Sequence, residues 1–265
     1  MDNATRLQYL EAMGITVWVP RQMPMVTEAE AMQSDMLQKP DSLETDDQKS
    51  LEELVIPTEY SDLGDKHFNI RSQSHDNVSF NNDWQTLQQQ VAACQQCSLC
   101  ETRTQTVFGV GNRHADWMLI GEAPGQNEDL QGEPFVGKAG QLLTEMLRAI
   151  GLGREEVYIA NMLKCRPPNN RDPLPAEVQA CHAFLQQQII LLQPKLILAV
   201  GRIAAQNLLN SKQTLSSLRG IRHQLHNIPL IVIPHPAYLL RSLLEKAKAW
   251  EDLQFALSVY KELEK

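Results

Sequence analysis

Beyond residue 80, short apolar runs alternate with amphipathic stretches, and this alternation predicts the elements of a main domain. Apolar runs of strand length cover residues 117–123, 157–163, 196–201 and 228–234. Stretches with helical periodicity cover residues 140–150, 176–192, 203–209 and 245–263. Strands separated by helices form parallel sheets that are covered on both faces. The pattern therefore predicts an α/β fold, a three-layer α/β/α sandwich around a central, mainly parallel four-stranded sheet.

The first 80 residues lack this alternation. Residues 25–80 are rich in Gln, Ser, Asp, Glu and Asn and sustain no apolar period, which predicts a flexible acidic linker. Within residues 1–24, Leu7, Leu10 and Met13 have helical spacing and precede an apolar stretch that contains Trp18. We predict a docking peptide here; the alternative is a segment that packs on the main domain, residues 81–265.

The acidity of the chain lies in the N-terminal part. The net charge is −8 overall, but residues 80–265 carry 18 basic and 17 acidic side chains, a net charge of +1. A nearly neutral domain can present a local basic groove, so charge neither supports nor excludes a nucleic-acid partner. No apolar run is long enough to cross a bilayer, and the N-terminus lacks the features of an export signal. We therefore expect a cytoplasmic protein with no membrane partner.

Residues suited to ligand binding or catalysis follow three of the predicted strands. The loop 121–137 begins with Gly121-Glu122-Ala123-Pro124-Gly125, Asn161 ends the second strand, and His235 follows the last one. In parallel α/β folds the loops at the carboxyl ends of the strands form the ligand crevice. We expect these three segments to form one cleft.

Five cysteines add a second kind of site. They are Cys94, Cys97, Cys100, Cys165 and Cys181, and in a reducing compartment metal ligands or buried thiols are more common than disulfides. Cys94-x-x-Cys97 provides the close pair typical of metal centres, but Cys97-x-x-Cys100 is an equally good pair. Zinc and an iron–sulfur cluster both fit four cysteines.

Residues 132–139 nearly match the nucleotide-binding P-loop. That motif needs Ser or Thr after its lysine to bind Mg²⁺, and here Ala139 follows Lys138. An NTP-dependent enzyme is therefore rejected. The glycines at 137 and 140 open a helix, whose free N–H groups could hold a DNA phosphate, or they serve a tight turn.

Taken together, the motifs resemble those of the family 4 uracil-DNA glycosylases, the iron–sulfur type. The resemblance covers residues 90–260 in order and rests on Cys94-x-x-Cys97, Arg103-Thr-Gln-Thr-Val-Phe-Gly109, Gly121-Glu-Ala-Pro-Gly-x-x-Glu128-Asp129, Gly132-x-Pro-Phe-Val-Gly137-x-Ala-Gly140, Asn161-x-x-Lys164-Cys165-Arg-Pro-Pro168 and His235-Pro-Ala-Tyr-Leu-Leu-Arg241. It implies hydrolysis of the N-glycosidic bond of deoxyuridine in DNA. It also implies a 4Fe-4S cluster on Cys94, Cys97, Cys165 and Cys181, with Cys100 spare.

The resemblance implies a role for each motif around a flipped nucleotide. Phe135 would stack on the uracil beside Gly121, and Asn161 would pair with N3–H and O4, which cytosine cannot match. His235 and backbone N–H groups near Glu122 and Ala123 would donate to uracil O2. No lysine is placed as a Schiff-base nucleophile, so we expect a monofunctional enzyme.

Two positions depart from better-known uracil glycosylases, as they do in the family that the chain resembles. Ala123 stands where those enzymes carry an aspartate that aligns water, and Gly125 stands where they carry a tyrosine that excludes thymine. We assign water positioning and leaving-group support to Glu122 and its surroundings, and crowding at uracil C5 to Glu128. Either glutamate could instead cap a backbone turn.

Two further segments complete the interpretation. The stretch 238–241 resembles a loop that enters the minor groove, with Leu240 as an apolar wedge and Arg241 on a phosphate; the leucine could equally belong to a helix core. The N-terminal Met13-Gly-Ile-Thr-x-Trp18 resembles the peptide by which the psi subunit of the bacterial clamp loader docks on the chi subunit. We expect a monomer, and the alternative function is a non-enzymatic iron–sulfur DNA-binding sensor or subunit.

Overall fold

The computed structural model describes Gln8, Leu10, Gly14 and residues 83–264. The predicted docking peptide, apart from those three residues, and the predicted linker lie outside the described part. In chain order the helices and strands are α2 (Trp84–Ala92), α3 (Leu99–Thr102), β1 (Val110–Gly111), β2 (Trp117–Gly121), α4 (Gln126–Gln131), α5 (Lys138–Ala149), β3 (Tyr158–Asn161), α6 (Pro175–Leu192), β4 (Leu196–Val200), α7 (Arg202–Leu208), α8 (Leu215–Leu218), β5 (His223–Leu225), β6 (Ile228–Ile233), α9 (Pro236–Leu239) and α10 (Glu245–Leu263). Short 3₁₀ turns at Arg154–Glu156 and Pro168–Asn170 precede and follow β3.

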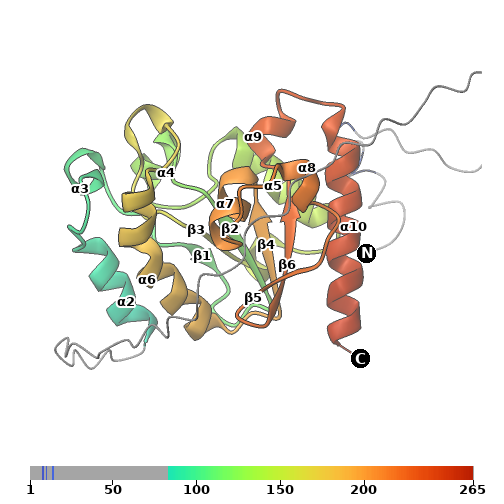
Figure 1. Cartoon of the computed structure of the whole chain (residues 1–265), viewed down its shortest axis with the longest axis horizontal. Helices are drawn as coiled ribbons and strands as arrows, with labels where there is room; N and C mark the ends of the chain where they lie inside the picture. Colours follow the sequence, from blue (N-terminus) through green and yellow to red (C-terminus); the bar gives the residue numbers. More distant parts are fainter. Residues whose placement is uncertain (1–7, 9, 11–13, 15–82, 265) are drawn as a thin grey trace, which may run out of the picture. The chain divides into compact units, whose positions relative to one another are not determined.

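The strands form one sheet in the order β1-β3-β2-β4-β6-β5 (Figure 1). The four predicted strands, β2, β3, β4 and β6, are its parallel centre. The sheet has six strands in the described part of the chain, not the four that we predicted. The two additional strands, β1 and β5, pair antiparallel at the edges and contain two and three residues. Such short strands leave no apolar alternation in a sequence.

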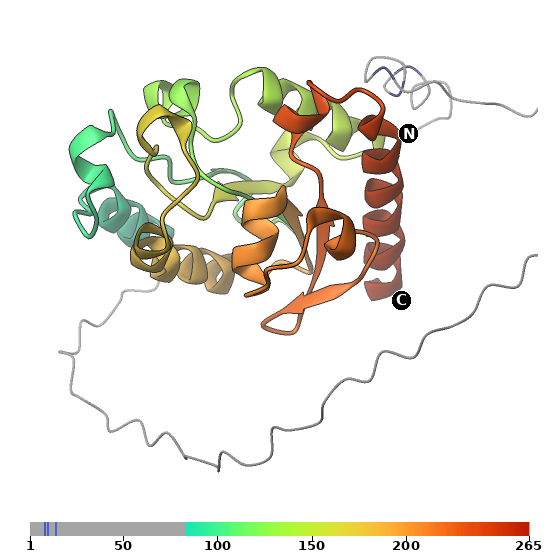
Figure 2. The same ribbon diagram turned by 45° about the horizontal axis from the view of Figure 1, so that its top comes forward.

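Helices cover both faces of the sheet, which confirms the three-layer α/β/α sandwich (Figure 2). Side chains of α5 and α10 form one core layer with Leu119, Ile159 and Leu198 of the central strands. Side chains of α6 and α7 form the other layer with the alternate strand positions, such as Ile120 and Ile197. Each central strand is buried on both faces, which explains why its sequence is an unbroken apolar run.

The carboxyl ends of the four parallel strands lie at one edge of the sheet. The chain passes from β2 to β3 on one side of β2 and then crosses to β4 on its other side. Such a reversal opens a crevice beyond the strand ends, because the two connections leave in opposite directions. The loops after β2, β3 and β6 meet there. Among the described helices, none is long and apolar enough to cross a membrane.

Candidate active site

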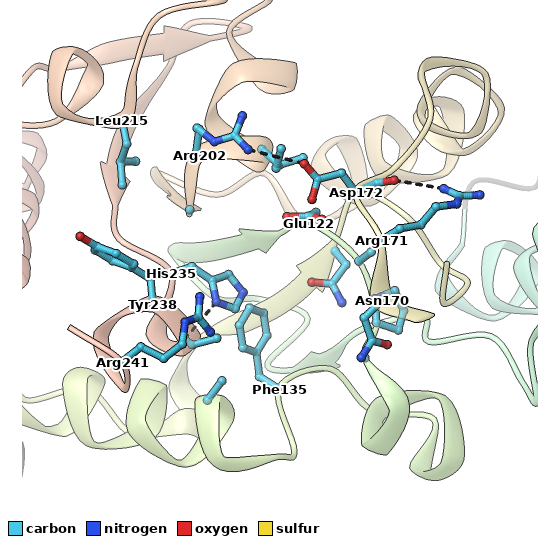
Figure 3. Close-up of a pocket in the computed structure, with 18 of the residues that line it drawn as sticks. Glu122, Phe135, Asn170, Arg171, Asp172, Arg202, Leu215, His235, Tyr238 and Arg241 are labelled. Carbon is cyan, nitrogen blue, oxygen red and sulfur yellow. Dashed lines mark hydrogen bonds and ion pairs between the residues drawn. The ribbon is translucent and has the colours of Figure 1, made fainter. Parts of the chain in front are cut away.

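A pocket of about 910 Å³ lies beyond these strand ends (Figure 3). Phe135, Asn161 and His235, which are up to 100 residues apart in the sequence, all line it. Glu122, Ala123, Glu128 and Arg241 also contribute to its walls. The structure therefore brings together most of the residues that the sequence analysis assigned to one cleft.

Asn161 is the most constrained polar side chain of the pocket. It ends β3, is 1% exposed, and its Oδ1 accepts no hydrogen bond from any described residue. A buried amide oxygen without a donor costs about 1–3 kcal/mol, so it is kept where a ligand supplies the donor. Gly121 of the neighbouring strand allows this arrangement, because a Cβ there would lie 2.4 Å from Oδ1 of Asn161 and 2.7 Å from the Phe135 ring.

Phe135 is presented by a strained segment. Its φ of +55° lies in the left-handed region, which costs a non-glycine residue about 1–3 kcal/mol. The ring is 7% exposed and stacks on His235, with ring centroids 5.6 Å apart. Gly140 lies directly behind it, since a Cβ there would lie 1.7 Å from the Phe135 carbonyl oxygen. The glycine thus serves a close turn, one of the two roles that we predicted for it.

Two charged side chains hold this segment from outside. Arg154 donates through Nη2 to the carbonyl oxygen of Pro134 at 2.6 Å. The carboxylate of Glu128 accepts the N–H groups of Val136 at 3.0 Å, Gly137 at 3.2 Å and Gly125 at 3.1 Å. Glu128 therefore caps two turns, the alternative that we kept open for it. Because it takes the N–H of Gly137, that group is not free for a phosphate.

Glu128 also explains the glycine at position 125. A Cβ on Gly125 would lie 2.7 Å from its Oε2, so the carboxylate fills the space next to this residue. Crowding at the base by Glu128 remains a prediction.

His235 has a fixed tautomer and is neutral. It precedes α9, and its Nδ1 accepts the N–H of Ala237 at 3.1 Å, so Nε2 carries the proton. Burial, together with the nearby charge of Arg241, lowers the pKa of His235 to about 4. At neutral pH this side chain is a hydrogen-bond donor without charge.

The pKa of Glu122 is shifted in the opposite direction. Burial raises the pKa of its carboxyl to about 7, the charge of Asp172 adds to the effect, and Arg202 opposes it. Arg202 itself is 3.5 Å from Asp172 in an ion pair at the pocket rim (Figure 3). Carboxyl groups with pKa values near the working pH are suited to acid–base roles. Sequence reasoning missed Asp172 and Arg202, because neither belongs to a motif with a recognisable spacing.

The loop after α9 carries the predicted wedge. Leu239 is 1% exposed and belongs to the core, whereas Leu240 is 42% exposed and does not line the pocket. Arg241, from the same loop, reaches the pocket wall. The core role is thus taken by Leu239, the neighbour of the predicted wedge.

Three of the five cysteines pack together next to the segment that follows β3. Cys165 and Cys181 are each 3% exposed and pack with Cys97. Burial raises the pKa of Cys165 and raises that of Cys181 to about 11; Cys97 lies close enough to both to add to the effect, and Cys94 does so at Cys165. Such thiols are inert nucleophiles but become thiolates when they bind a metal.

The donor set fits a four-cysteine centre in its chemistry. Cys97, Cys165 and Cys181 pack together, and Cys94 lies close enough to Cys165 to act on its pKa. Arg103 connects these segments: it donates to Sγ of Cys165 at 3.1 Å and to the carbonyl oxygen of Cys94 at 2.8 Å. Within the described part of the chain, no three His, Cys, Asp or Glu side chains are spaced to hold a single metal ion.

Lys164 lies between the pocket and the cysteines. It is 1% exposed, and burial lowers its pKa to about 7, while the nearby Cys181 and Cys165 oppose the shift. The sequence contained no signal for this burial, since a lysine in a loop is normally exposed.

Comparisons with known proteins agree with this geometry. The family model of the uracil DNA glycosylase superfamily matches residues 108–254. The chain is 48% identical over 159 residues to the type-4 uracil-DNA glycosylase of Archaeoglobus fulgidus, which covers 57% of this chain and 80% of that protein. It is 41% identical over 179 residues to the type-4 enzyme of Thermotoga maritima, covering 66% of this chain and 93% of that protein. The type-5 uracil-DNA glycosylase of Thermus thermophilus is 32% identical over 135 residues, 45% of this chain and 61% of its own.

Proposed function

The chain belongs to the uracil-DNA glycosylase superfamily, and from this membership we propose that it hydrolyses the N-glycosidic bond of deoxyuridine in DNA, the first step of base excision repair. The products are free uracil and an abasic site. The observation that carries this proposal is the buried, unpartnered Oδ1 of Asn161, which faces the pocket that Phe135 and His235 also line. Because no described residue donates to this oxygen, it can accept a hydrogen bond from uracil N3–H.

Base recognition follows from the shape and donors of the pocket. A uracil must leave the duplex to reach it, at a cost of about a few kcal/mol, which stacking on Phe135 partly offsets. Asn161 accepts from N3–H through Oδ1 and donates through its NH₂ group to O4. Cytosine has no N3–H and carries a donor at position 4, so both contacts would fail. Asn161 thus selects uracil.

Bond cleavage places negative charge on the departing base and positive charge on the sugar. The neutral His235 donates from Nε2 to uracil O2, where the negative charge develops, with backbone N–H groups near Glu122 and Ala123 as further donors. Glu122 as a carboxylate stabilises the sugar cation and orients the attacking water. A lyase would need a lysine amine as its nucleophile. Among the described residues that line the pocket, the lysine is Lys248, whose Nζ donates to Glu245 at 2.7 Å. We therefore propose a monofunctional enzyme without lyase activity.

We also propose that Cys94, Cys97, Cys165 and Cys181 hold a 4Fe-4S cluster. When bound, the cluster supplies a rigid cross-link between the segment before α3, the loop after β3, and α6. The packing of Cys97, Cys165 and Cys181, the nearness of Cys94 to Cys165 and the guanidinium of Arg103 support this donor set. Purified protein should absorb broadly at about 400 nm and contain iron and sulfide. Colourless protein loaded with zinc would reject the cluster.

The activity is tested with an oligonucleotide that contains one uracil, followed by alkali and a gel. Cleavage at the uracil position is expected for the unmodified protein, and Asn161→Ala should lose it. A thymine oligonucleotide is the control. DNA binding without release of uracil would reject the glycosylase and favour the alternative, a non-enzymatic iron–sulfur sensor. Trapping with borohydride should give no covalent product.

For the N-terminal residues we propose docking on the replication machinery, through the clamp-loader chi subunit, with the enzyme as a cytosolic monomer near the chromosome. Leu10 is 3% exposed and packs with the core layer of α5 and α10, which supports the alternative of a segment that packs on its own domain. A pull-down with chi decides between them. Docking requires that Trp18→Ala abolishes capture, and unchanged capture removes the proposal.

A further inference from the structure

Lys164 is a buried side chain that the proposed reaction does not use. It lies three residues after Asn161 and directly before Cys165. Its side chain is 1% exposed, and its backbone N–H acts as a hydrogen-bond donor to the Cys181 thiol. Burying an ammonium group is costly unless acceptors and negative charge surround it, so its position calls for an explanation.

The contacts of Lys164 lead to the uracil pocket. Its Nζ donates to the backbone carbonyl oxygen of Asn161 at 2.7 Å and to Oε1 of Gln188 at 2.6 Å. The first contact fixes the main chain at the residue whose side chain reads the base. Asn161 is the last residue of β3, and Lys164 supplies a donor to its carbonyl oxygen.

Gln188 anchors the other end of this network. It is fully buried on α6, and its Nε2 donates to the carbonyl oxygen of Phe108 at 2.8 Å and to the hydroxyl of Tyr158 at 3.1 Å. Because both donor positions of Nε2 are used in this way, the amide oxygen Oε1 of Gln188 is oriented toward Lys164. Cys181 lies seven residues earlier on α6, two turns away and on the same face. One helix therefore supplies both a proposed cluster ligand and the anchor of Lys164.

We propose that Lys164 is a positioning residue that couples the cysteine cluster to the uracil pocket: its Nζ holds the backbone of Asn161 in place, and the next residue along the chain is the proposed cluster ligand Cys165. This inference rests on the proposed uracil pocket and cluster. Removing the amino group leaves the Asn161 carbonyl and Gln188 Oε1 without a donor, so the end of β3 shifts. The shift moves Cys165 with it and changes the hydrogen bonding around the cluster, which alters the potential of the cluster.

The test is Lys164→Met, which keeps the length and the apolar stem and removes the ammonium. Holoprotein is compared by three measurements: kcat/KM on single-stranded uracil DNA, the inhibition constant of free uracil, and the midpoint potential of the cluster. We expect kcat/KM to fall about 10-fold, inhibition by uracil to weaken by a similar factor, and the midpoint potential of the cluster to shift. Lys195→Met is the matched control, because Lys195 is half-exposed and paired with Asp116 at 2.9 Å. All three quantities should stay unchanged in it.

Each result has a defined meaning. A loaded Lys164→Met protein with normal kinetics and a normal potential overturns the proposal. If this variant does not fold or retain iron, Gln188→Met replaces it, since it removes the anchor but keeps the ammonium; it should show a weaker loss in uracil binding, and normal uracil binding overturns the proposal. Wild-type holoprotein that releases no uracil rejects the glycosylase function instead, while the potential of Lys164→Met still tests the coupling of Lys164 to the cluster.

Discussion

The two walls of the pocket differ in how firmly they are held. The Phe135 segment, residues 132–140, is buried at its tip, has a strained backbone, and is held by Arg154, Glu128 and the absence of a side chain at Gly140. The Leu240 segment, residues 235–244, begins at the fixed His235 but ends in exposed leucines: Leu243 is 63% and Leu244 is 91% exposed. Stacking of a flipped base requires a preformed wall, whereas opening a duplex requires a surface that can enter between its bases.

This difference makes the two walls separable by experiment. Damage to the Phe135 segment should slow the reaction on every uracil substrate, because the flipped base meets it in each case. Damage to the Leu240 segment should matter only where a duplex must be opened.

The largest effect is expected from Gly140→Val. Its Cβ would meet the Phe135 carbonyl oxygen at 1.7 Å and must displace the stacking wall. A misplacement of about 1 Å can cost about 100-fold, so we expect kcat/KM to fall at least about 100-fold on single-stranded and duplex substrates alike. Gly137→Ala is the control, since its Cβ would meet only the end of the Asn127 side chain, at 2.9 Å, and should cost much less. Equal losses in the two variants would show that the wall is not rigid.

The second effect concerns Glu122, which lines the same pocket. If its carboxylate is the active form, kcat/KM rises with pH through about 7 and then levels. Glu122→Gln should lower the plateau about 100-fold and remove that rise. His235 is neutral above about pH 4, so its titration does not change kcat/KM in this pH range. An unchanged pH profile in Glu122→Gln would reject the assignment.

The same carboxyl group gives a stability prediction with a defined sign. Because its pKa is raised in the folded protein, the ionised form is disfavoured there, and Glu122 destabilises the fold progressively as pH rises from about 4.5 to about 7. The Tm of Glu122→Gln should exceed that of the wild type at pH 8. The advantage should vanish near pH 4, and a constant difference at both pH values would contradict this account.

A smaller effect is expected from Arg154→Gln, which weakens the support of the Phe135 segment without touching the base. Loss of the charged contact to Pro134 should reduce kcat/KM about 10-fold on all substrates. Arg154→Lys can still donate to that carbonyl and should recover part of the rate. Arg148→Gln, in an exposed pair with Glu145 on α5, is the control and should behave as wild type. A fully active Arg154→Gln would leave the wall held by Glu128 alone.

The smallest effect is expected from Leu240→Ala. Losing an exposed apolar wedge should reduce activity on duplex DNA a few-fold, about 3–10-fold, and leave the single-stranded rate unchanged. Ile190→Ala, 54% exposed on α6, is the matched control. Full activity of Leu240→Ala on both substrates removes the wedge role, and equal losses on both would place Leu240 with the fixed wall.

The sequence predicted the fold closely where the signal was local. Each central strand is buried on both faces, so its apolar run identified it, and the limits of the predicted strands lie within two residues of those observed. The edge strands β1 and β5 went unpredicted because two or three residues form no pattern. Helix α4 went unpredicted as well, since its residues Gln126–Gln131 are nearly all polar.

For the candidate site, the sequence located residues but not their contacts. Motif order placed Phe135, Asn161 and His235 after three strands, and the topology of a parallel sheet brought them to one edge. The sequence left two roles open for Glu128. The structure favours capping, because Glu128 accepts hydrogen bonds from residues that lie eight and nine positions away.

The sequence by itself determined which residue types are present, where the buried strands run, and that chemically active residues follow them, because these properties depend on neighbours along the chain. Only the tertiary structure decided that Phe135 has a left-handed backbone, that Arg154 holds its segment, and that Lys164 connects Asn161 to Gln188. Two of those contacts, Arg154 with Pro134 and Gln188 with Lys164, join residues 20 and 24 positions apart. Burial and unmet hydrogen bonds are properties of packed surroundings, and no local pattern of residues encodes them.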